Sequence, residues 1–210
     1  MTDERTIAME RLREQGLGCT RCDLHLSGTH VVWGEGDLHA QVMLIGQGPG
    51  EQEAKAGRPF VGPSGEVLNE WLATTGIDRS KLWISNTIKH WATSLNERGR
   101  RVNRTPKTSE VQACRIWIEG ELTIVAPKIL VCIGAPSAQA IIDKKFKITE
   151  SRGQWFKGPN DEDVIATFHP SYLIRLRAAD VAAYDAAWAQ VLDDFRAVAE
   201  RAGELNIDLN

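Results

Sequence analysis

The residues of this sequence best suited to metal chemistry are its four cysteines: Cys19, Cys22, Cys114 and Cys132. Cys19 and Cys22 form a C-x-x-C pair in a glycine-bounded loop, a spacing that lets two thiolates reach one metal ion or cluster. Cys132 lies inside the apolar run ILVCIG, which predicts a small buried side chain. Cys114 therefore remains as the candidate third thiolate.

Three further segments carry polar groups suited to reading a small ligand: GQGPGE (Gly46 to Glu51), SNTIKH (Ser85 to His90) and FHPSYL (Phe168 to Leu173). In the first, glycine exposes the backbone, so the N–H groups around Gly46 and Gly48 can approach an anion or a carbonyl closely. The segment lacks the spacing of a Walker loop or a dinucleotide fingerprint, so it gives little support to a nucleotide cofactor.

A run of cations predicts a local phosphate-binding patch on a chain whose formal net charge is −3. The cations lie in RGRRVNRTPK and are Arg98, Arg100, Arg101, Arg104 and Lys107. The alternative is a solvated flexible loop. The overall charge argues against a histone-like polyelectrolyte binder.

These segments need elements that bring them together. Four β-branched runs, each too short for a typical helix, predict strands at Gln41 to Gly48, Lys81 to Lys89, Lys128 to Pro136 and Asp163 to Pro170. Helix-length segments lie between or after them, at Gly65 to Thr75, Thr108 to Val125, Pro136 to Asp143 and Ala178 to Ala202. This alternation predicts an α/β fold with a four-stranded parallel sheet covered on both faces. Ligands of such sheets bind beyond the carboxyl ends of the strands.

Composition sets the remaining expectations. With 210 residues, 42% hydrophobic and 25% charged, the chain matches a single globular domain spanning residues 1–210. No apolar run approaches the roughly 18 residues of a membrane span. The polar start MTDERTIAMERLREQ predicts a cytoplasmic protein with reduced thiols. A monomer is the default expectation for a protein that acts on a bulky polymer.

At this point the motifs become specific. GQGPGEQEAKAGRPFVGPSGEVLN, SNTIKH, NRTP, the Ala113–Cys114 pair and TFHPSYL resemble, in this order, the motifs of the family 4 uracil-DNA glycosylases. The resemblance covers the chain from Gly18 to Arg175. It implies a three-layer α/β/α sandwich with an iron–sulfur cluster, and excision of uracil from DNA by cleavage of the N-glycosidic bond.

The resemblance also implies roles for individual residues. Such an enzyme extrudes the target nucleotide and reads its base in a pocket. Phe60 matches the ring that stacks on uracil, and Asn86 matches the amide that reads its polar edge. His169 matches the histidine that donates a hydrogen bond to O2 as the base leaves. Ser171, Tyr172 and Arg175 are expected near a DNA phosphate, with Leu173 as a wedge in the duplex.

Two positions depart from the family pattern. Gln47 stands where the family usually has an acid that activates water, and an amide cannot accept a proton. Glu51 or Glu53 are the candidate substitutes. The basic stretch also resembles the UdgX branch, which couples covalently to deoxyribose through a histidine. Asn103 stands at that place as a substrate-contacting residue, and an amide is a poor nucleophile, so no lasting adduct is expected.

The resemblance extends to the metal ligands. The family's fourth ligand is a cysteine after the lysine of the second strand end, and here that place is His90, as in the UdgX branch. The expected group is a 4Fe–4S cluster held by Cys19, Cys22, His90 and Cys114. A zinc ion is the second alternative, because three thiolates and one imidazole also suit zinc. A thiol pair without metal is the third.

Three functions follow from these observations. The first is a monofunctional DNA glycosylase acting on uracil or a related pyrimidine, with Gln47, Glu51 and His169 as its catalytic residues. The second is a binding protein that keeps the base pocket but has lost the chemistry at Gln47. The third is a hydrolase of free nucleosides, which the cationic segment from Arg98 to Lys107 disfavours.

Overall fold

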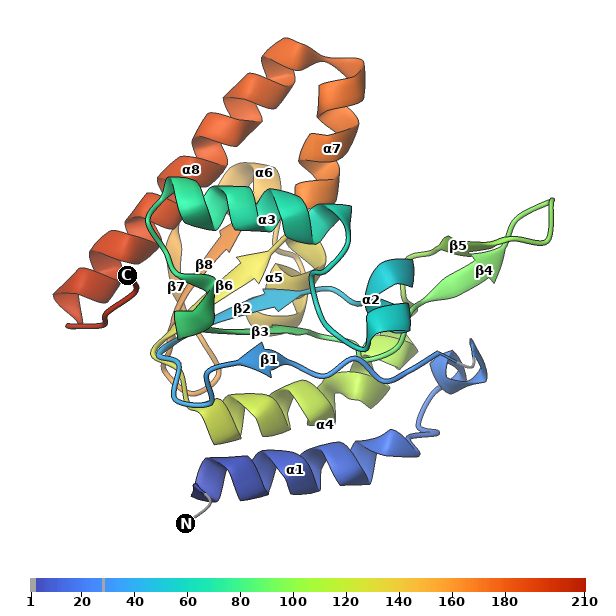
Figure 1. Cartoon of the computed structure of the whole chain (residues 1–210). Helices are drawn as coiled ribbons and strands as arrows, with labels where there is room; N and C mark the ends of the chain where they lie inside the picture. Colours follow the sequence, from blue (N-terminus) through green and yellow to red (C-terminus); the bar gives the residue numbers. More distant parts are fainter. Residues whose placement is uncertain (1–2, 28) are drawn as a thin grey trace.

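The computed structural model describes residues 3–27 and 29–210, and one mixed sheet lies at its centre (Figure 1). The sheet has six strands in the order β1-β3-β2-β6-β8-β7. The four inner strands are parallel, and the two edge strands run antiparallel to their neighbours. The strands are β1 Glu35–Gly36, β2 Val42–Gly46, β3 Leu82–Asn86, β6 Ile129–Ile133, β7 Trp155–Lys157 and β8 Asp163–Thr167. The four predicted parallel strands are confirmed, and two short antiparallel edges extend their sheet.

Helices cover both faces of the sheet, so the predicted α/β/α layering is confirmed (Figure 1). Alternate residues of β2 point to opposite sides, with Val42 and Leu44 in one core and Met43 and Ile45 in the other. The first core packs under α3, α7 and α8, and the second under α1, α4 and α5. The helices are α1 Glu4–Leu17, α2 Glu51–Ala56, α3 Pro63–Thr74, α4 Thr108–Val125, α5 Ala135–Ile141, α6 Ile148–Ser151, α7 Pro170–Ala179 and α8 Val181–Glu204, with short 3-10 turns η1 Asp23–Ser27 and η2 Arg79–Lys81.

The last predicted helix needs a correction. It was expected to begin at Ala178, but the chain breaks at Asp180, between α7 and α8. Asp180 has extended backbone angles, and its Oδ1 accepts the N–H of Ala183 at 3.0 Å, which caps the start of α8. The break lets α7 lie beside the strand ends while α8 packs across the sheet.

A two-stranded hairpin replaces the expected cationic loop. Its strands are β4 Thr93–Leu95 and β5 Arg101–Asn103, and it projects away from the three layers (Figure 1). Asn96 closes its turn, because its Oδ1 accepts the N–H groups of Arg98 and Arg100, both at 3.0 Å. Arg98, Arg100 and Arg101 are therefore carried on an ordered ribbon, whereas Arg104 and Lys107 follow it on the way to α4.

Membrane insertion finds no support among the described helices, since none combines the length and apolar character that spanning a bilayer requires.

Candidate functional site

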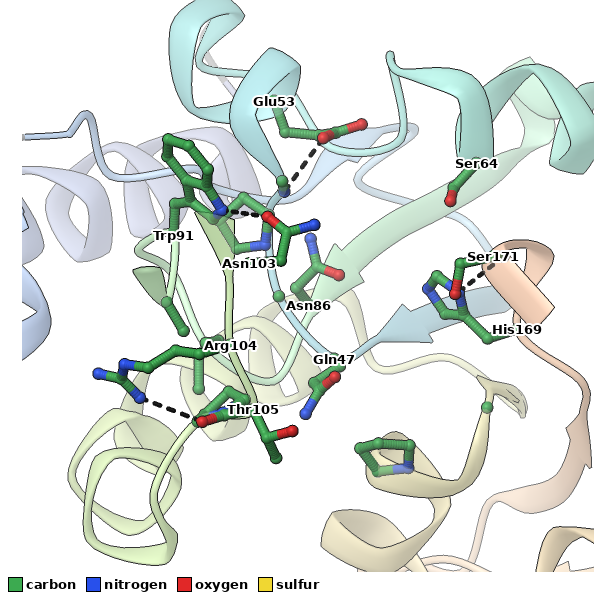
Figure 2. A pocket seen from close by; sticks show the side chains of 18 of the residues that line it. Gln47, Glu53, Ser64, Asn86, Trp91, Asn103, Arg104, Thr105, His169 and Ser171 are labelled. Carbon is green, nitrogen blue, oxygen red and sulfur yellow. Dashed lines mark hydrogen bonds between the residues drawn. The ribbon is translucent and has the colours of Figure 1, made fainter. Parts of the chain in front are cut away.

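A cavity of about 1050 Å³ opens at the carboxyl ends of the four parallel strands. Gln47 follows β2, Asn86 ends β3, Gly134 follows β6 and His169 follows β8, and all four line this cavity. The hairpin contributes a further wall through Asn103 and its neighbours (Figure 2). The cavity thus lies where the topology of an open parallel sheet predicts a ligand.

Phe60 and Asn86 meet at the end of β2, over Gly46. A Cβ added to Gly46 would overlap Asn86 Oδ1 and lie 2.7 Å from the Phe60 ring, so only glycine leaves room for both. Phe60 itself has a φ of 51°, a left-handed conformation that non-glycine residues rarely adopt. The Phe60 backbone is therefore strained, and in this conformation its aromatic ring lies beside the Asn86 amide.

The Asn86 side chain is buried and has no polar partner in the described chain. The residue is 2% exposed, and the hydrogen bond it makes outside the sheet uses its backbone carbonyl, which accepts Lys89 Nζ at 3.0 Å. The amide lines the cavity (Figure 2), so its donor and acceptor are free to pair with a ligand that offers a matching acceptor and donor.

His169 is a neutral ring with one proton left for the cavity. Its Nδ1 accepts the N–H of Ser171 at 3.1 Å and lies 2.8 Å from Ser171 Oγ, so Nε2 carries the ring proton. Burial, assisted by the nearby Arg175 guanidinium, lowers the pKa of His169 to about 4. Arg175 in turn donates to Ser171 Oγ at 3.3 Å. The ring lies 6.3 Å from that of Phe60, centroid to centroid.

The glycine-rich turn places an amide, and no free carboxylate, in the cavity. The backbone carbonyl of Gln47 accepts Thr87 Oγ1 at 2.7 Å and the Ile88 N–H at 3.0 Å, while its side-chain amide faces the cavity (Figure 2). Gly48 lies against Ile88, where a Cβ would come within 2.5 Å of that side chain. Glu51 is exposed and pairs with Lys55 at 2.6 Å.

Glu53 has a structural role that the sequence motifs did not reveal. Its two carboxylate oxygens accept the N–H groups of Gly50 at 3.0 Å, Val61 at 3.0 Å and Gly62 at 2.7 Å. The residue therefore clamps the turn after β2 to the loop that carries Phe60. All its hydrogen bonds are to backbone N–H groups, so both oxygens of Glu53 are engaged in holding the two loops together.

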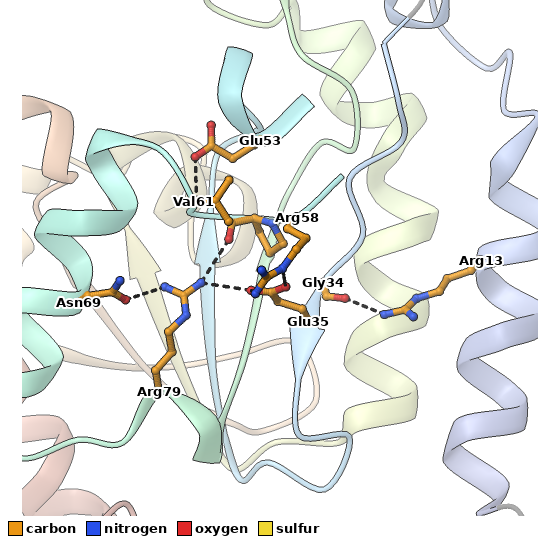
Figure 3. Close-up of polar contacts among 9 residues, drawn as sticks. Arg13, Gly34, Glu35, Glu53, Arg58, Val61, Asn69 and Arg79 are labelled. Carbon is orange, nitrogen blue, oxygen red and sulfur yellow. Dashed lines mark hydrogen bonds and ion pairs between the residues drawn. The ribbon is translucent and has the colours of Figure 1, made fainter. Parts of the chain in front are cut away.

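Ion pairs fix the same loop from its other side (Figure 3). Glu35 on β1 pairs with Arg58 at 2.7 Å and Arg79 at 3.3 Å. Arg79 also donates to the Pro59 carbonyl at 3.2 Å and to Asn69 Oδ1 at 2.9 Å. These residues lie far apart in the sequence, so no local motif could reveal them. Together with Glu53 they hold the strained backbone of Phe60.

Some of the predicted DNA- and substrate-contacting residues of this segment already have partners within the chain, and others are exposed. Asn103 Oδ1 accepts the indole N–H of Trp91, and Arg101 lines the cavity. Arg104 also lines it, but its guanidinium is committed to Glu110 at 2.8 and 2.6 Å. Four of the predicted cations are exposed: Arg98, Arg100, Arg101 and Lys107.

One expectation for the loop after β8 is wrong. Tyr172 and Ser171 line the cavity, but Leu173 is 0% exposed and packs in the core with α3 and α8. A fully buried side chain cannot enter a DNA duplex. The helical turn that begins at Pro170 points this leucine inward, because α7 must bury one face.

Three of the four cysteines gather at one end of the molecule. Cys19, Cys22 and Cys114 share an apolar cluster with Trp33 and Trp117, whereas Cys132 lies in the sheet core. Cys19 Sγ accepts the indole N–H of Trp117, and Cys114 Sγ accepts the backbone N–H of Lys89, both at 3.3 Å. Burial raises the pKa of Cys114 to about 11.

His90 directly follows Lys89 and is 8% exposed, which places it next to Cys114. Burial lowers its pKa, with nearby His25 adding to the effect. Within residues 3–27 and 29–210, no three His, Cys, Asp or Glu side chains converge on a point that would hold one metal ion. The donor chemistry nevertheless fits an iron–sulfur cluster, since the set is three thiols and an imidazole and two sulfurs already receive N–H donors.

A buried ion pair connects this cysteine cluster to the cavity. Lys89 Nζ lies 2.9 Å from Glu121 Oε2 and 2.8 Å from Ser85 Oγ, and Ser85 also bonds Glu121. Glu121 Oε1 accepts the Gly34 N–H at 2.9 Å. Because Lys89 also binds the Asn86 carbonyl and the sulfur of Cys114, one residue joins both sites.

The cavity thus combines an aromatic ring, a side-chain amide and a neutral imidazole at the carboxyl ends of a parallel sheet. Residues 33–193 match the family model of the uracil DNA glycosylase superfamily. The chain is 40% identical over 174 residues to the type-4 uracil-DNA glycosylase of Thermotoga maritima, which covers 82% of this chain and 86% of that protein. It is 32% identical over 172 residues to the type-4 uracil-DNA glycosylase of Sulfurisphaera tokodaii, covering 78% and 74%. The chain therefore belongs to the uracil DNA glycosylase superfamily.

Proposed function

We propose that this protein is a DNA glycosylase that extrudes uracil from DNA and hydrolyses its N-glycosidic bond in base-excision repair. The observation that carries the proposal is the unpaired Asn86 amide beside the Phe60 ring. Uracil presents a flat face and an edge with the O4 acceptor and the N3–H donor. The amide pairs with both, and the ring stacks on the face.

The same pair supports selection against cytosine. Cytosine has an amino group where uracil has O4, so an amide oriented for uracil meets a donor with its own donor. Two donors that face each other both stay unpaired, and this lowers the affinity of the pocket for cytosine. The close packing at Gly46 fixes where the Asn86 amide lies. Selectivity then depends on which of its two ends, the oxygen or the nitrogen, faces the base.

Departure of the base depends on stabilising its negative charge. The C1′–N1 bond breaks, and its electron pair leaves on uracil, so the charge spreads to O2. His169 is in its neutral form with Nε2–H available, and therefore acts as a hydrogen-bond donor and not as a general acid. The N-termini of α3 and α7 border the cavity at Ser64 and Ser171 and add favourable dipoles.

Water completes the reaction at C1′. Its oxygen bonds to the sugar cation, and its proton passes to solvent or to the departing uracil anion. Gln47 holds this water by its amide without taking the proton. Such assistance is weaker than a carboxylate, so we infer a slow turnover.

A DNA strand is held by groups on two sides of the cavity. We assign phosphate contacts to the exposed cations Arg98, Arg100, Arg101 and Lys107, to Arg175 and to the Ser171 hydroxyl. Arg104 contributes through the hairpin that it anchors to Glu110. The four free cysteines suit a reducing compartment such as the cytoplasm.

We propose that Cys19, Cys22, His90 and Cys114 hold a 4Fe–4S cluster. Base excision transfers no electron, so the cluster supplies cross-linking of the amino-terminal segment to the segment after β3. Purified protein should show broad visible absorption with iron and acid-labile sulfide in equal amounts. Zinc without sulfide would instead favour the single-ion alternative.

A second function, recognition without turnover, is favoured by one observation. The cavity holds no unengaged carboxylate among its described lining residues, because Glu51 pairs with Lys55 and Glu53 clamps backbone. In this case the protein binds uracil in DNA and leaves it in place. The pocket geometry is the same for both functions.

One assay separates the two. Purified protein is incubated with an oligonucleotide bearing a single uracil, and the product is treated with alkali. Strand scission at the uracil supports the glycosylase. A shifted band without scission supports the binding protein, and neither outcome with any oligonucleotide contradicts both. A band that survives SDS would contradict our expectation that Asn103 forms no covalent adduct.

A further inference from the structure

The hairpin of β4 and β5 presents an apolar side chain among cations. Leu95 ends β4 and is 69% exposed. Isolated exposed leucines are common on protein surfaces, so exposure alone indicates nothing. Three further features distinguish Leu95: the face of the hairpin it occupies, the rigidity of the turn beside it, and the charge around it.

The strand register places Leu95 on the same face of the hairpin as Asn103. Leu95 lies opposite Arg101, and Thr93 lies opposite Asn103, and opposed residues and their second neighbours share one face of an antiparallel ribbon. Residues 101–104 all line the cavity, and the Asn103 side chain lies in it near Asn86 (Figure 2). Leu95 lies two residue steps along the strand from the Thr93–Asn103 pair, which is roughly 7 Å, or about two base steps.

The turn next to Leu95 is closed by its own hydrogen bonds. Asn96 accepts two backbone N–H groups through Oδ1, and its own N–H donates to the Arg100 carbonyl at 2.9 Å. Gly99 takes a φ of +68°, which this tight turn requires. The backbone that carries Leu95 is therefore ordered before any partner arrives, and this lowers the entropic cost of presenting the side chain.

The charge around Leu95 matches the groove of a nucleic acid duplex. Arg101 lies opposite Leu95, and Arg98 and Arg100 lie in the turn with a single acid, Glu97; none of the three arginines makes an ion pair with a residue of the described ranges. An apolar tip between free cations suits a base stack that lies between two phosphate backbones.

Building on the proposed function, we propose that Leu95 enters the base stack of duplex DNA beside the extruded uracil and holds the duplex open. Leu173 cannot enter the base stack, because it is buried in the core. Extruding a base from a duplex costs a few kcal/mol of stacking and pairing, and an inserted apolar side chain replaces part of that loss. In single strands little stacking is lost, so Leu95 matters there much less.

The test compares uracil excision from duplex and from single-stranded oligonucleotides of the same sequence. Leu95→Ala should lower kcat/KM on the duplex about 10-fold and on the single strand less than about 2-fold. Leu95→Met, which restores an apolar side chain of similar length, should recover most of the duplex activity. Val181→Ala removes a side chain that is 64% exposed away from the cavity, and should leave both rates unchanged.

A second measurement reads unstacking directly. A duplex carries 2-aminopurine next to a 2′-fluorinated deoxyuridine, whose sugar resists hydrolysis. Binding of the unchanged protein should raise the fluorescence, and Leu95→Ala should remove at least about half of that rise. An equal loss of activity on both substrates, or an unchanged duplex rate with unchanged fluorescence, overturns the proposal. Absence of excision by the unchanged protein from either substrate would instead contradict the proposed glycosylase, while the fluorescence still tests Leu95.

Discussion

At the scale of single residues, the proposed reaction assigns one group in the cavity to each task of base release. In this proposal Phe60 provides the stacking face, Asn86 reads the edge, and His169 faces the charge that develops on the base. The protonation state of His169 decides how it acts. Its Nδ1 is already an acceptor and its pKa is lowered to about 4, so the ring is neutral at physiological pH.

This gives a prediction for the pH dependence of His169→Ala. The rate of excision should fall about 100-fold, as for the loss of one oxyanion donor. Because the folded ring stays neutral, the ratio of the two rates should stay constant from pH 8 to about pH 5.5. Single-turnover rates of both proteins across this range provide the measurement. A ratio that changes about tenfold around pH 6.5 would show that the protonated ring is the active form.

The same shift affects stability with a defined sign. An unfolded histidine titrates near 6.5, so between about pH 6.5 and 4 the unfolded chain binds more protons at this position than the folded protein. The contribution of His169 to the free energy of unfolding is therefore complete above pH 6.5 and is lost as the pH falls through this window. Urea unfolding of the wild type and His169→Ala at pH 7 and pH 5 should show a smaller difference at pH 5.

Gln47 carries the third prediction at this scale. Gln47→Glu places a carboxylate where only an amide lines the cavity, and should raise the single-turnover rate about 10-fold or more through general-base assistance. Gln47→Ala is the control and should lower the rate, because the water then loses its amide partner. If Gln47→Glu leaves the rate unchanged, the amide is not what limits hydrolysis.

At the scale of elements, the position of Phe60 depends on a clamp between α2 and the loop before α3. Glu53 accepts hydrogen bonds from three backbone N–H groups, those of Gly50, Val61 and Gly62. Glu53→Gln replaces one acceptor oxygen by a donor and should lower the free energy of unfolding by about 1–3 kcal/mol. Glu51→Gln is a matched control two residues away, where only an exposed pair is lost, and should cost less than about 1 kcal/mol.

Urea unfolding measures both variants, and the excision rate adds a second readout. If Glu53 positions Phe60, Glu53→Gln should also weaken binding of uracil-containing DNA under conditions where the protein remains folded. Equal stability losses in the two variants would mean that the three hydrogen bonds contribute nothing beyond a surface pair.

The sequence predicted these elements unevenly. The four inner strands are buried on both faces, so their continuous apolar runs were easy to recognise, and α4 was predicted with its observed bounds Thr108–Val125. The edge strands β1 and β7 contain two and three residues and carry no such pattern. Leu173 was misplaced because its motif fixes its position in the chain but not the face of α7 on which it lies.

The residues of the candidate site were also predicted unevenly. Phe60, Asn86 and His169 were proposed from motifs, and the fold brings them to one cavity. Glu53 was proposed only as a substitute base, and Arg79 and Lys89 were not proposed at all, because their roles come from hydrogen bonds to backbone groups and buried carboxylates that the sequence does not show. Arg104 was grouped with the free cations because its pairing with Glu110 is visible only in three dimensions.

At the scale of the whole molecule, charge is separated between a mildly acidic body and the cationic hairpin. The net charge of −3 disfavours general adhesion to DNA, so binding depends on the local cations. Arg98, Arg100 and Arg101 changed together to Ala should reduce the slope of log Kd against log salt by about 2–3, because each lost phosphate contact removes about 0.7–0.9. Lys128, Lys144 and Lys145 changed together give the same loss of charge away from the cavity, and should leave the slope nearly unchanged.

Titration of a labelled oligonucleotide at several salt concentrations provides this measurement. If both triple variants lower the slope equally, attraction comes from overall charge and not from the hairpin.

Gly46 has a practical consequence for such work. Its backbone angles are those of an ordinary strand, so alanine is acceptable to the chain itself, yet the added methyl group would occupy the space between Phe60 and Asn86. Gly46→Ala thus fills the floor of the base slot while leaving the cations, the cysteines and the sheet unchanged. It offers a reference protein for separating adhesion to the DNA backbone from admission of a base.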